Sequence, residues 1–184
     1  MVISSEALRG FYPAGPGSRE IDAATLAFPT EPLALAICPS EFELGGLTAI
    51  IESHAGHTQA DLIVRVPERN VVFTGDLLFN GRYTVAVDAD MVAWRRTLDR
   101  FAAYDRRRQF VPGHQAACGR EVVREQSARM DDLRAHGEKM MRAGATAEEA
   151  ERRHIVPKRF QKYEVDPRAF TIGAAMRSYY AIGA

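Results

Sequence analysis

The stretch HAGHTQADLIVRVPERNVVFTGDLLF, residues 54–79, decides the fold class of this chain. Within it, the apolar runs at 61–66 and 71–74 have the composition of β-strands, and the intervening PERN at 67–70 has that of a turn. Two strands joined by so short a turn pair as an antiparallel hairpin. Working outward, Gly45 and Gly46 separate FEL from LTAIIES at 47–53, which predicts a second hairpin, and PLALAIC at 32–38 is also β-like.

Helical patterns dominate the rest of the chain. Asp88 or Asp90 can cap a helix that ends near Tyr104, because apolar residues recur there at three- and four-residue steps: Met91, Trp94, Leu98 and Phe101. A short strand at 109–112 precedes a long helix at 119–143; a capping box, Thr146 with Glu149, begins the next helix, and a last one runs from about 167 to 180. This order predicts one α/β domain over residues 1–184, with the two long helices on one face of the sheet.

The composition is that of a globular protein. Of 184 residues, 46% are hydrophobic and 26% are charged, which excludes a disordered tail. The 24 basic and 24 acidic residues balance, so there is no general attraction to nucleic acid or to an anionic membrane. Two cysteines without a CxxC motif, no stretch of about 20 apolar residues and no signal-peptide pattern lead us to expect a cytoplasmic protein.

Three polar residues share one setting that favours ligand binding. His57, Asp76 and His114 each follow a glycine just past a predicted strand, where ligand sites gather in α/β proteins. Two imidazoles and a carboxylate are competent ligands for Zn²⁺ or a similar divalent ion. Taken one at a time, each has an ordinary alternative, a surface histidine or a Gly-Asp turn, and spacings of 19 and 38 residues match no short metal motif.

The motifs GHT at 56–58, TGD at 74–76 and PGH at 112–114, in this order, resemble the C-terminal half of a metallo-β-lactamase-superfamily hydrolase. The resemblance implies an αββα architecture, of which this chain would form a partial sandwich with a mixed sheet. It also implies that His57 holds one metal, Asp76 bridges two metals and His114 holds the second. The metal would be zinc, or another divalent metal such as iron or manganese. Thr58 and Asp61 would orient His57 from the second shell.

One departure from the family pattern limits these expectations. The HxHxDH motif, which supplies most of the ligands of both metals, is absent, because the sequence contains neither HxH nor DH. The chain thus resembles a family member truncated at its N-terminal end, with partial metal occupancy. We expect it to be a metal-dependent hydrolase of an ester, thioester or lactam bond, or part of one, with activity near background on its own. The alternative is a non-catalytic remnant that serves as a binding or interaction module.

The missing half also predicts an assembly. In the family sandwich two sheets pack face to face, so each inner face is apolar. The apolar strand residues of this chain have more surface than two helices on one face can cover, and large exposed apolar patches are rare in monomers. We therefore expect a homodimer, the commonest symmetric assembly, with a small-molecule substrate as the other partner if the protein is active.

The remaining candidates have structural interpretations. Trp94 is expected in the core, Cys118 as an inert packed thiol, and His54 as a non-ligand. His136 and His154 lie in charged helical surroundings, which predicts that both face solvent. The run of arginines at 106–108 follows a helix; we interpret it as a solvated cap that complements the helix dipole rather than as an anion site.

Overall fold

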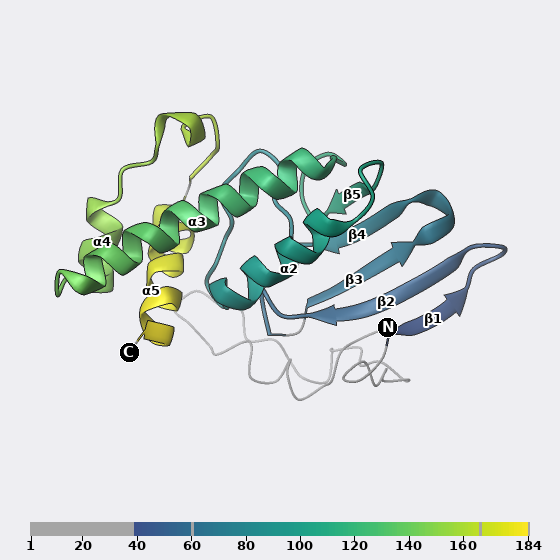
Figure 1. Cartoon of the computed structure of the whole chain (residues 1–184), viewed down its shortest axis with the longest axis horizontal. Helices are drawn as coiled ribbons and strands as arrows, with labels where there is room; N and C mark the ends of the chain where they lie inside the picture. The colour runs from purple at the N-terminus through teal and green to yellow at the C-terminus, as the bar shows by residue number, and fades with distance from the viewer. Residues whose placement is uncertain (1–38, 60, 166, 184) are drawn as a thin grey trace, which may run out of the picture.

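The computed structural model describes residues 39–59, 61–165 and 167–183. Its sheet has five strands in chain order: β1 (Ser40–Glu43), β2 (Thr48–His54), β3 (Asp61–Val66), β4 (Val71–Gly75) and β5 (Gln109–Pro112). Neighbours are antiparallel from β1 to β4, and β5 runs parallel to β4, so the sheet is mixed as predicted (Figure 1). The predicted strand at 32–38 lies outside the described residues.

Both predicted hairpins form. β1 and β2 meet at Gly45 and Gly46, whose φ angles of 61° and 90° are readily adopted by glycine alone. β3 and β4 are joined by the short 3₁₀ helix η2 (Pro67–Arg69) and by Asn70, which has a φ of 55°. Asparagine tolerates this left-handed conformation better than most residues, so the turn occurs where the sequence signals it.

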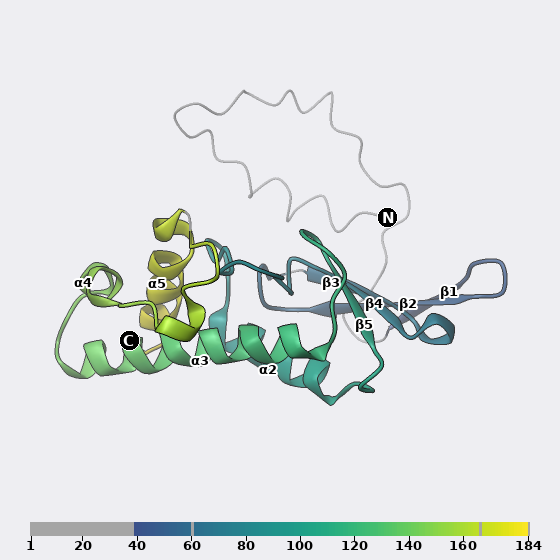
Figure 2. The same ribbon diagram turned by 90° about the horizontal axis from the view of Figure 1, so that it is seen from above.

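The two long helices follow the predicted boundaries closely. α2 (Met91–Ala103) begins at Asp90, whose Oδ1 accepts hydrogen bonds from the N–H groups of Val92 and Ala93. It forms the crossover between the parallel strands β4 and β5. α3 (Arg120–Arg142) packs beside α2, and Figure 2 shows both helices on the same side of the sheet. The prediction of helices on one face is thus confirmed for the described residues.

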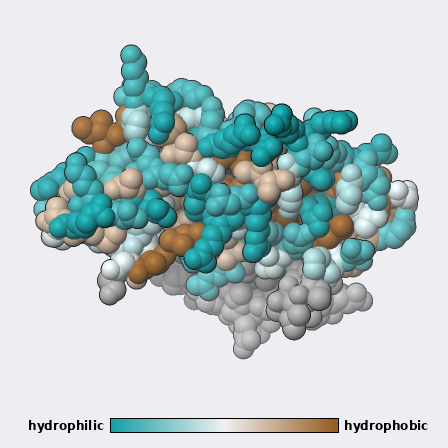
Figure 3. Space-filling model, in the orientation of Figure 1, coloured by the Kyte–Doolittle hydropathy of each residue, from teal (hydrophilic) through white to brown (hydrophobic). Residues whose placement is uncertain are grey.

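The sheet has two different faces. Toward the helices it presents Ile63, Val72 and Phe110, all fully buried, against a core that includes Trp94 and Phe101. The register places a second set of mostly apolar side chains on the opposite face: Phe42, Val64, Val66, Val71, Phe73 and Val111. The side chains of Phe42 and Phe73 are 39% and 46% exposed. The outer surface of the helix layer is mostly hydrophilic (Figure 3).

The C-terminal helices pack at one end of this layer. α4 (Ala147–Arg153) begins with the predicted capping box, in which Thr146 Oγ1 accepts from the Glu149 N–H and the Glu149 carboxylate accepts from the Thr146 N–H. After the 3₁₀ helices η3 (Lys158–Phe160) and η4 (Arg168–Phe170), α5 (Ile172–Gly183) packs against α3 and α4. It begins later than predicted, because η4 occupies the first turn. No helix among the described residues is long and apolar enough to cross a membrane.

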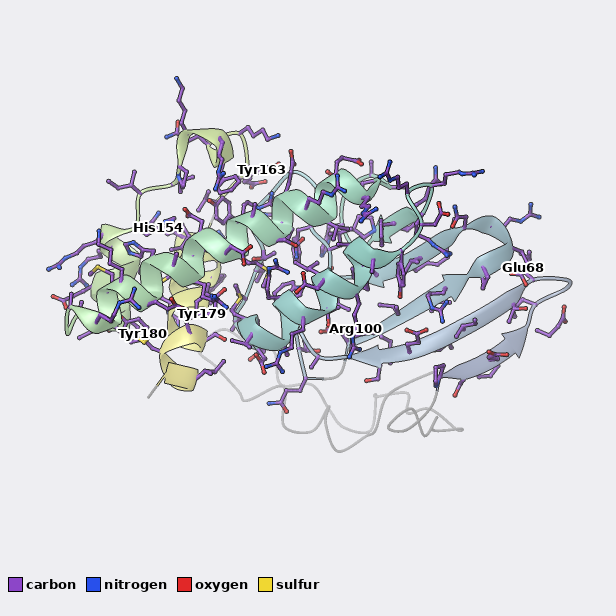
Figure 4. The ribbon with its side chains drawn as sticks, in the orientation of Figure 1. Glu68, Arg100, His154, Tyr163, Tyr179 and Tyr180 are labelled. Atoms are coloured by element: carbon purple, nitrogen blue, oxygen red, sulfur yellow. The ribbon has the colours of Figure 1, made fainter. Side chains whose placement is uncertain are left out.

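The prediction that His154 faces solvent is wrong. Its side chain is only 2% exposed, and its Nε2 lies 2.9 Å from Asp132 Oδ2 on α3. The ring also meets that of His136 edge-on, 4.9 Å between centroids, and His136 is itself half-buried, with Nε2 2.8 Å from the Ala150 carbonyl oxygen. His154 is buried because α4 folds back on α3 and brings this residue, which directly follows α4, against that helix (Figure 4).

Candidate metal centre

The topology brings three strand ends to one edge of the sheet. β2 and β4 are both antiparallel to β3, so they run in the same direction, and β5 is parallel to β4. The C-terminal ends of these three strands therefore lie at the same edge. His57 follows β2 by three residues, Asp76 directly follows β4, and His114 follows β5 by two residues. All three predicted metal ligands are thus on loops at this edge.

Asp76 and His114 come into direct contact there. His114 Nε2 lies 3.5 Å from Asp76 Oδ1, with the two side chains 59% and 32% exposed. Two ligands of a tetrahedral zinc ion, each about 2.1 Å from the metal, are about 3.4 Å apart. The separation therefore suits two donors on one ion, and both side chains are accessible to a metal from solvent.

Glycine makes this contact sterically feasible. The Gly113 N–H donates to the Gly75 carbonyl, 2.9 Å from nitrogen to oxygen, which joins the two loops. A Cβ at position 113 would lie 2.3 Å from Asp76 Oδ1, so a side chain there would push the carboxylate away. Gly75, the last residue of β4, has a φ of 52°, which turns the chain sharply just before Asp76.

Phe79 lies close to both histidine rings. The Phe79 ring centroid is 6.0 Å from that of His57 and 6.3 Å from that of His114, and the His57 ring also meets Trp94 edge-on at 5.5 Å. Phe79 carries no sequence signal that distinguishes it from an ordinary core residue. Within the described ranges, no group of three or more His, Cys, Asp or Glu side chains is arranged to hold a metal ion.

Asp61 organises the loop that carries His57. Its carboxylate accepts from the Thr58 N–H and the Thr58 hydroxyl, both at 2.9 Å, and its Oδ1 lies 3.9 Å from His57 Nδ1. Burial raises the pKa of the Asp61 carboxyl, and the hydrogen bonds from Thr58 partly oppose this rise. Thr58 and Asp61 are therefore placed to hold the His57 loop and to orient its imidazole. That they do so for a metal ligand stays a prediction.

The other sequence candidates behave as structural residues. His54 is buried, with its ring 6.0 Å from that of Phe101, and burial lowers its pKa, although the nearby Glu52 opposes this shift. Burial likewise raises the pKa of the Cys118 thiol to about 11, which keeps it protonated and unreactive at neutral pH. Arg108 stacks on Tyr104, with 5.5 Å from Cζ to the ring centroid.

Comparison of the sequence with known proteins supports the resemblance to the metallo-β-lactamase superfamily. Residues 11–114, more than half of the chain, match the family model described as the metallo-beta-lactamase superfamily. A curated relative, metallo-beta-lactamase type 2 of Bacteroides fragilis, is 35% identical over 72 residues, which cover 37% of this chain and 29% of that protein. The chain therefore belongs to the metallo-beta-lactamase superfamily. Members of this superfamily generally bind zinc or other divalent metals.

Solved structures are similar in fold. A metallo-beta-lactamase from Pontibacter korlensis superposes with a TM-score of 0.51 at 19% identity, over 57% of this chain and 50% of that one. The double mutant S233Y F250G of the sec-alkyl sulfatase PisA1 gives a TM-score of 0.64 at 15% identity, over 86% of this chain and 27% of that one. This chain thus spans half or less of the length of each relative. The likeness at these identities concerns the fold alone.

Proposed function

We propose that this chain carries part of the active centre of a metal-dependent hydrolase that acts on ester, thioester or lactam bonds. The observation that carries the proposal is the 3.5 Å contact between Asp76 and His114, at the edge where three strands end. Asp76 and His114 would hold one divalent ion, zinc first among the candidates, ahead of iron and manganese. His57 would serve a second ion that shares Asp76.

The described residues would have different roles around such a metal centre. Bound metal supplies a Lewis acid that activates water and polarises the carbonyl under attack. Asp76 and His114 contribute an oxygen and a nitrogen donor, and Asp61 holds the loop of His57 in place through Thr58. The rings of Phe79 and Trp94 pack against the His57 imidazole and keep water from that side of it.

The donor set in the described residues is incomplete. The pair Asp76 and His114 fits one edge of a metal coordination sphere, but no third His, Cys, Asp or Glu in the described part of the chain joins it. Membership of the superfamily supports a hydrolase. The absence of the HxHxDH motif from the sequence supports weak binding of the metal ion. We therefore propose that this chain by itself retains less than one tightly held ion.

Cobalt titration tests the proposal. Co²⁺ substitutes for zinc and reports its ligands through visible absorption, so the protein and the variants Asp76→Asn and His114→Gln are titrated at pH 7.5. Even outer-shell partners change metal affinity by about 10–100-fold, so loss of a direct ligand should weaken binding by at least about tenfold. His136→Gln is the matched control, because His136 lies on α3 and bonds the Ala150 carbonyl instead.

The outcomes separate the two candidate functions. Unchanged Co²⁺ affinity in both ligand variants would sink the metal-centre proposal, and no Co²⁺ binding by the wild-type chain would favour the non-catalytic binding module. Elemental analysis after dialysis against a mild chelator tests the occupancy. Two zinc ions retained per chain would contradict the incomplete donor set.

A further inference from the structure

The segment that follows Asp76 is held by a buried side chain from a distant helix. Gln126 of α3 is completely buried, and its amide makes two hydrogen bonds to this segment. Its Oε1 accepts from the Phe79 N–H at 2.7 Å, and its Nε2 donates to the Leu77 carbonyl oxygen at 3.1 Å. The glutamine thus satisfies one donor and one acceptor of an irregular loop, as a neighbouring strand would.

Two further side chains hold the same segment. The indole Nε1 of Trp94, on α2, donates to the Leu77 carbonyl oxygen at 2.8 Å. Arg129, one turn after Gln126 on α3, donates from Nη2 to the Arg82 carbonyl oxygen at 3.3 Å and to that of Phe79 at 3.5 Å. The loop at 77–82 is therefore fixed at three points by the helix layer.

Arg129 has an unusual environment for a cation. It is 2% exposed, and its Cζ stacks 4.0 Å from the ring centroid of Tyr163 (labelled in Figure 4). Burial lowers its pKa to about 10, partly opposed by Tyr83 and Glu125. No ion pair to Arg129 occurs among the described residues, so the carbonyl groups of the loop are its main polar partners. The buried guanidinium of Arg129 therefore binds the loop backbone rather than a carboxylate.

From these contacts we infer that Gln126, together with Trp94 and Arg129, positions the carboxylate of Asp76 against His114. The inference rests on the proposed function. Asp76 lies between Gly75, whose carbonyl oxygen accepts from the Gly113 N–H, and Leu77, whose carbonyl group both Trp94 and Gln126 bind. Because hydrogen bonds hold Leu77, Asp76 has few backbone conformations available, and its carboxylate stays beside His114.

A buried glutamine on an apolar helix face supports this role. Gln126 lies in the stripe that also contains Val122, Met130 and Leu133, all buried. Burying an amide is unfavourable unless its hydrogen bonds are made, so an apolar residue would pack there with less risk. What an apolar residue cannot do is bind the backbone of residues 77–79, and that is what Gln126 does.

The test compares Gln126→Leu with Tyr179→Phe. Leucine removes both hydrogen bonds to the loop. The Tyr179 hydroxyl donates to the Met130 carbonyl oxygen at 3.1 Å, so its removal deletes one buried hydrogen bond to the same helix without touching residues 77–82. Trp94→Phe, which keeps a ring but loses the donor to Leu77, is a second variant in case Gln126→Leu does not fold. Circular dichroism confirms folding of each.

Amide hydrogen exchange and Co²⁺ absorption are the two readouts. We expect exchange of the Phe79 amide to accelerate by about tenfold in Gln126→Leu, because its acceptor is gone. Co²⁺ affinity should fall by about 10–100-fold, and the visible bands should shift as the ligand geometry changes. In Tyr179→Phe both readouts should match the wild type.

The two proposals fail in distinguishable ways. A folded Gln126→Leu variant with a protected Phe79 amide and an unchanged Co²⁺ spectrum would overturn the positioning role. Fast Phe79 exchange in Gln126→Leu with unchanged Co²⁺ binding in Asp76→Asn would support the attachment of the loop and overturn the metal centre. Equal losses in Gln126→Leu and Tyr179→Phe would show a merely structural effect and overturn the positioning role.

Discussion

Replacing Gly56 by alanine should destabilise the fold through overpacking. Gly56 lies in the turn between β2 and His57, and a Cβ there would be 2.5 Å from Leu77 Cδ2 and 3.0 Å from Trp94 Cγ. Carbon atoms pack at about 3.5–4.0 Å, so Leu77 must move by about 1–1.5 Å and Trp94 by about 0.5–1 Å. Leu77 and Trp94 are both fully buried and have no room to retreat. Overpacking of this kind costs about 1–3 kcal/mol.

Gly137→Ala is the matched control, with the opposite sign. Gly137 lies inside α3, and a Cβ there would meet only Met176 Sδ at 3.5 Å and Tyr179 atoms at 3.8 Å or more. These are ordinary van der Waals contacts. Because glycine in a helix interior is about 0.5–1 kcal/mol less stable than alanine, the substitution should stabilise the protein by that amount.

Thermal unfolding followed by circular dichroism measures both effects. For a chain of this size, 1 kcal/mol shifts Tm by about 2–4 °C. The Gly56→Ala variant should therefore melt about 2–12 °C lower than the wild type, and Gly137→Ala about 1–4 °C higher. A Gly56→Ala protein as stable as the wild type would refute the reasoning, because it would mean that Leu77 and Trp94 can move aside freely.

Two further predictions concern pH and assembly. Burial lowers the pKa of both His54 and His154 below 6.5, so near that pH the unfolded chain binds protons that the folded chain does not. The free energy of unfolding should therefore be highest above pH 6.5 and should decline as the pH falls below it. Urea unfolding at pH 7.5 and 5.5 measures this decline, which should be smaller in His154→Gln. An unchanged stability between these pH values would contradict the burial of both rings. The homodimer stays a prediction, supported by the exposed Phe42 and Phe73 on the face opposite the helices. Light scattering at micromolar concentration should give twice the chain mass. A stable monomer would exclude the homodimer.

Local signals predicted the hairpins and helices well. The turn at 67–70, the cap at Asp90 and the capping box at Thr146 each depend on residues within four positions of one another. Their hydrogen bonds form within the segment itself, so a reader of the sequence can locate them. The start of α5 was predicted too early, because the segment before it forms the 3₁₀ helix η4 and Thr171, with a φ of −102° and a ψ of −86°, interrupts the helical backbone.

The positions of the candidate ligands were predictable only in part. A glycine stands before each of His57, Asp76 and His114, and the resemblance of the motifs around them predicts these residues as ligands. The contact of Asp76 with His114, and the position of Phe79 near both the His57 and the His114 rings, depend on the strand order and on the packing of side chains between the loops. No spacing along the chain encodes those distances.

The sequence by itself determined the α/β class, the two hairpins and the two long helices, because each depends on short-range periodicity or turn chemistry; the candidate ligands that its motifs name stay a prediction. Only the tertiary structure decided that His154 is buried against Asp132 and that Gln126 binds Leu77 and Phe79. These contacts join residues 22 to 49 positions apart. Helix packing creates these contacts, and no local sequence pattern around a polar residue shows which distant group it will hydrogen-bond.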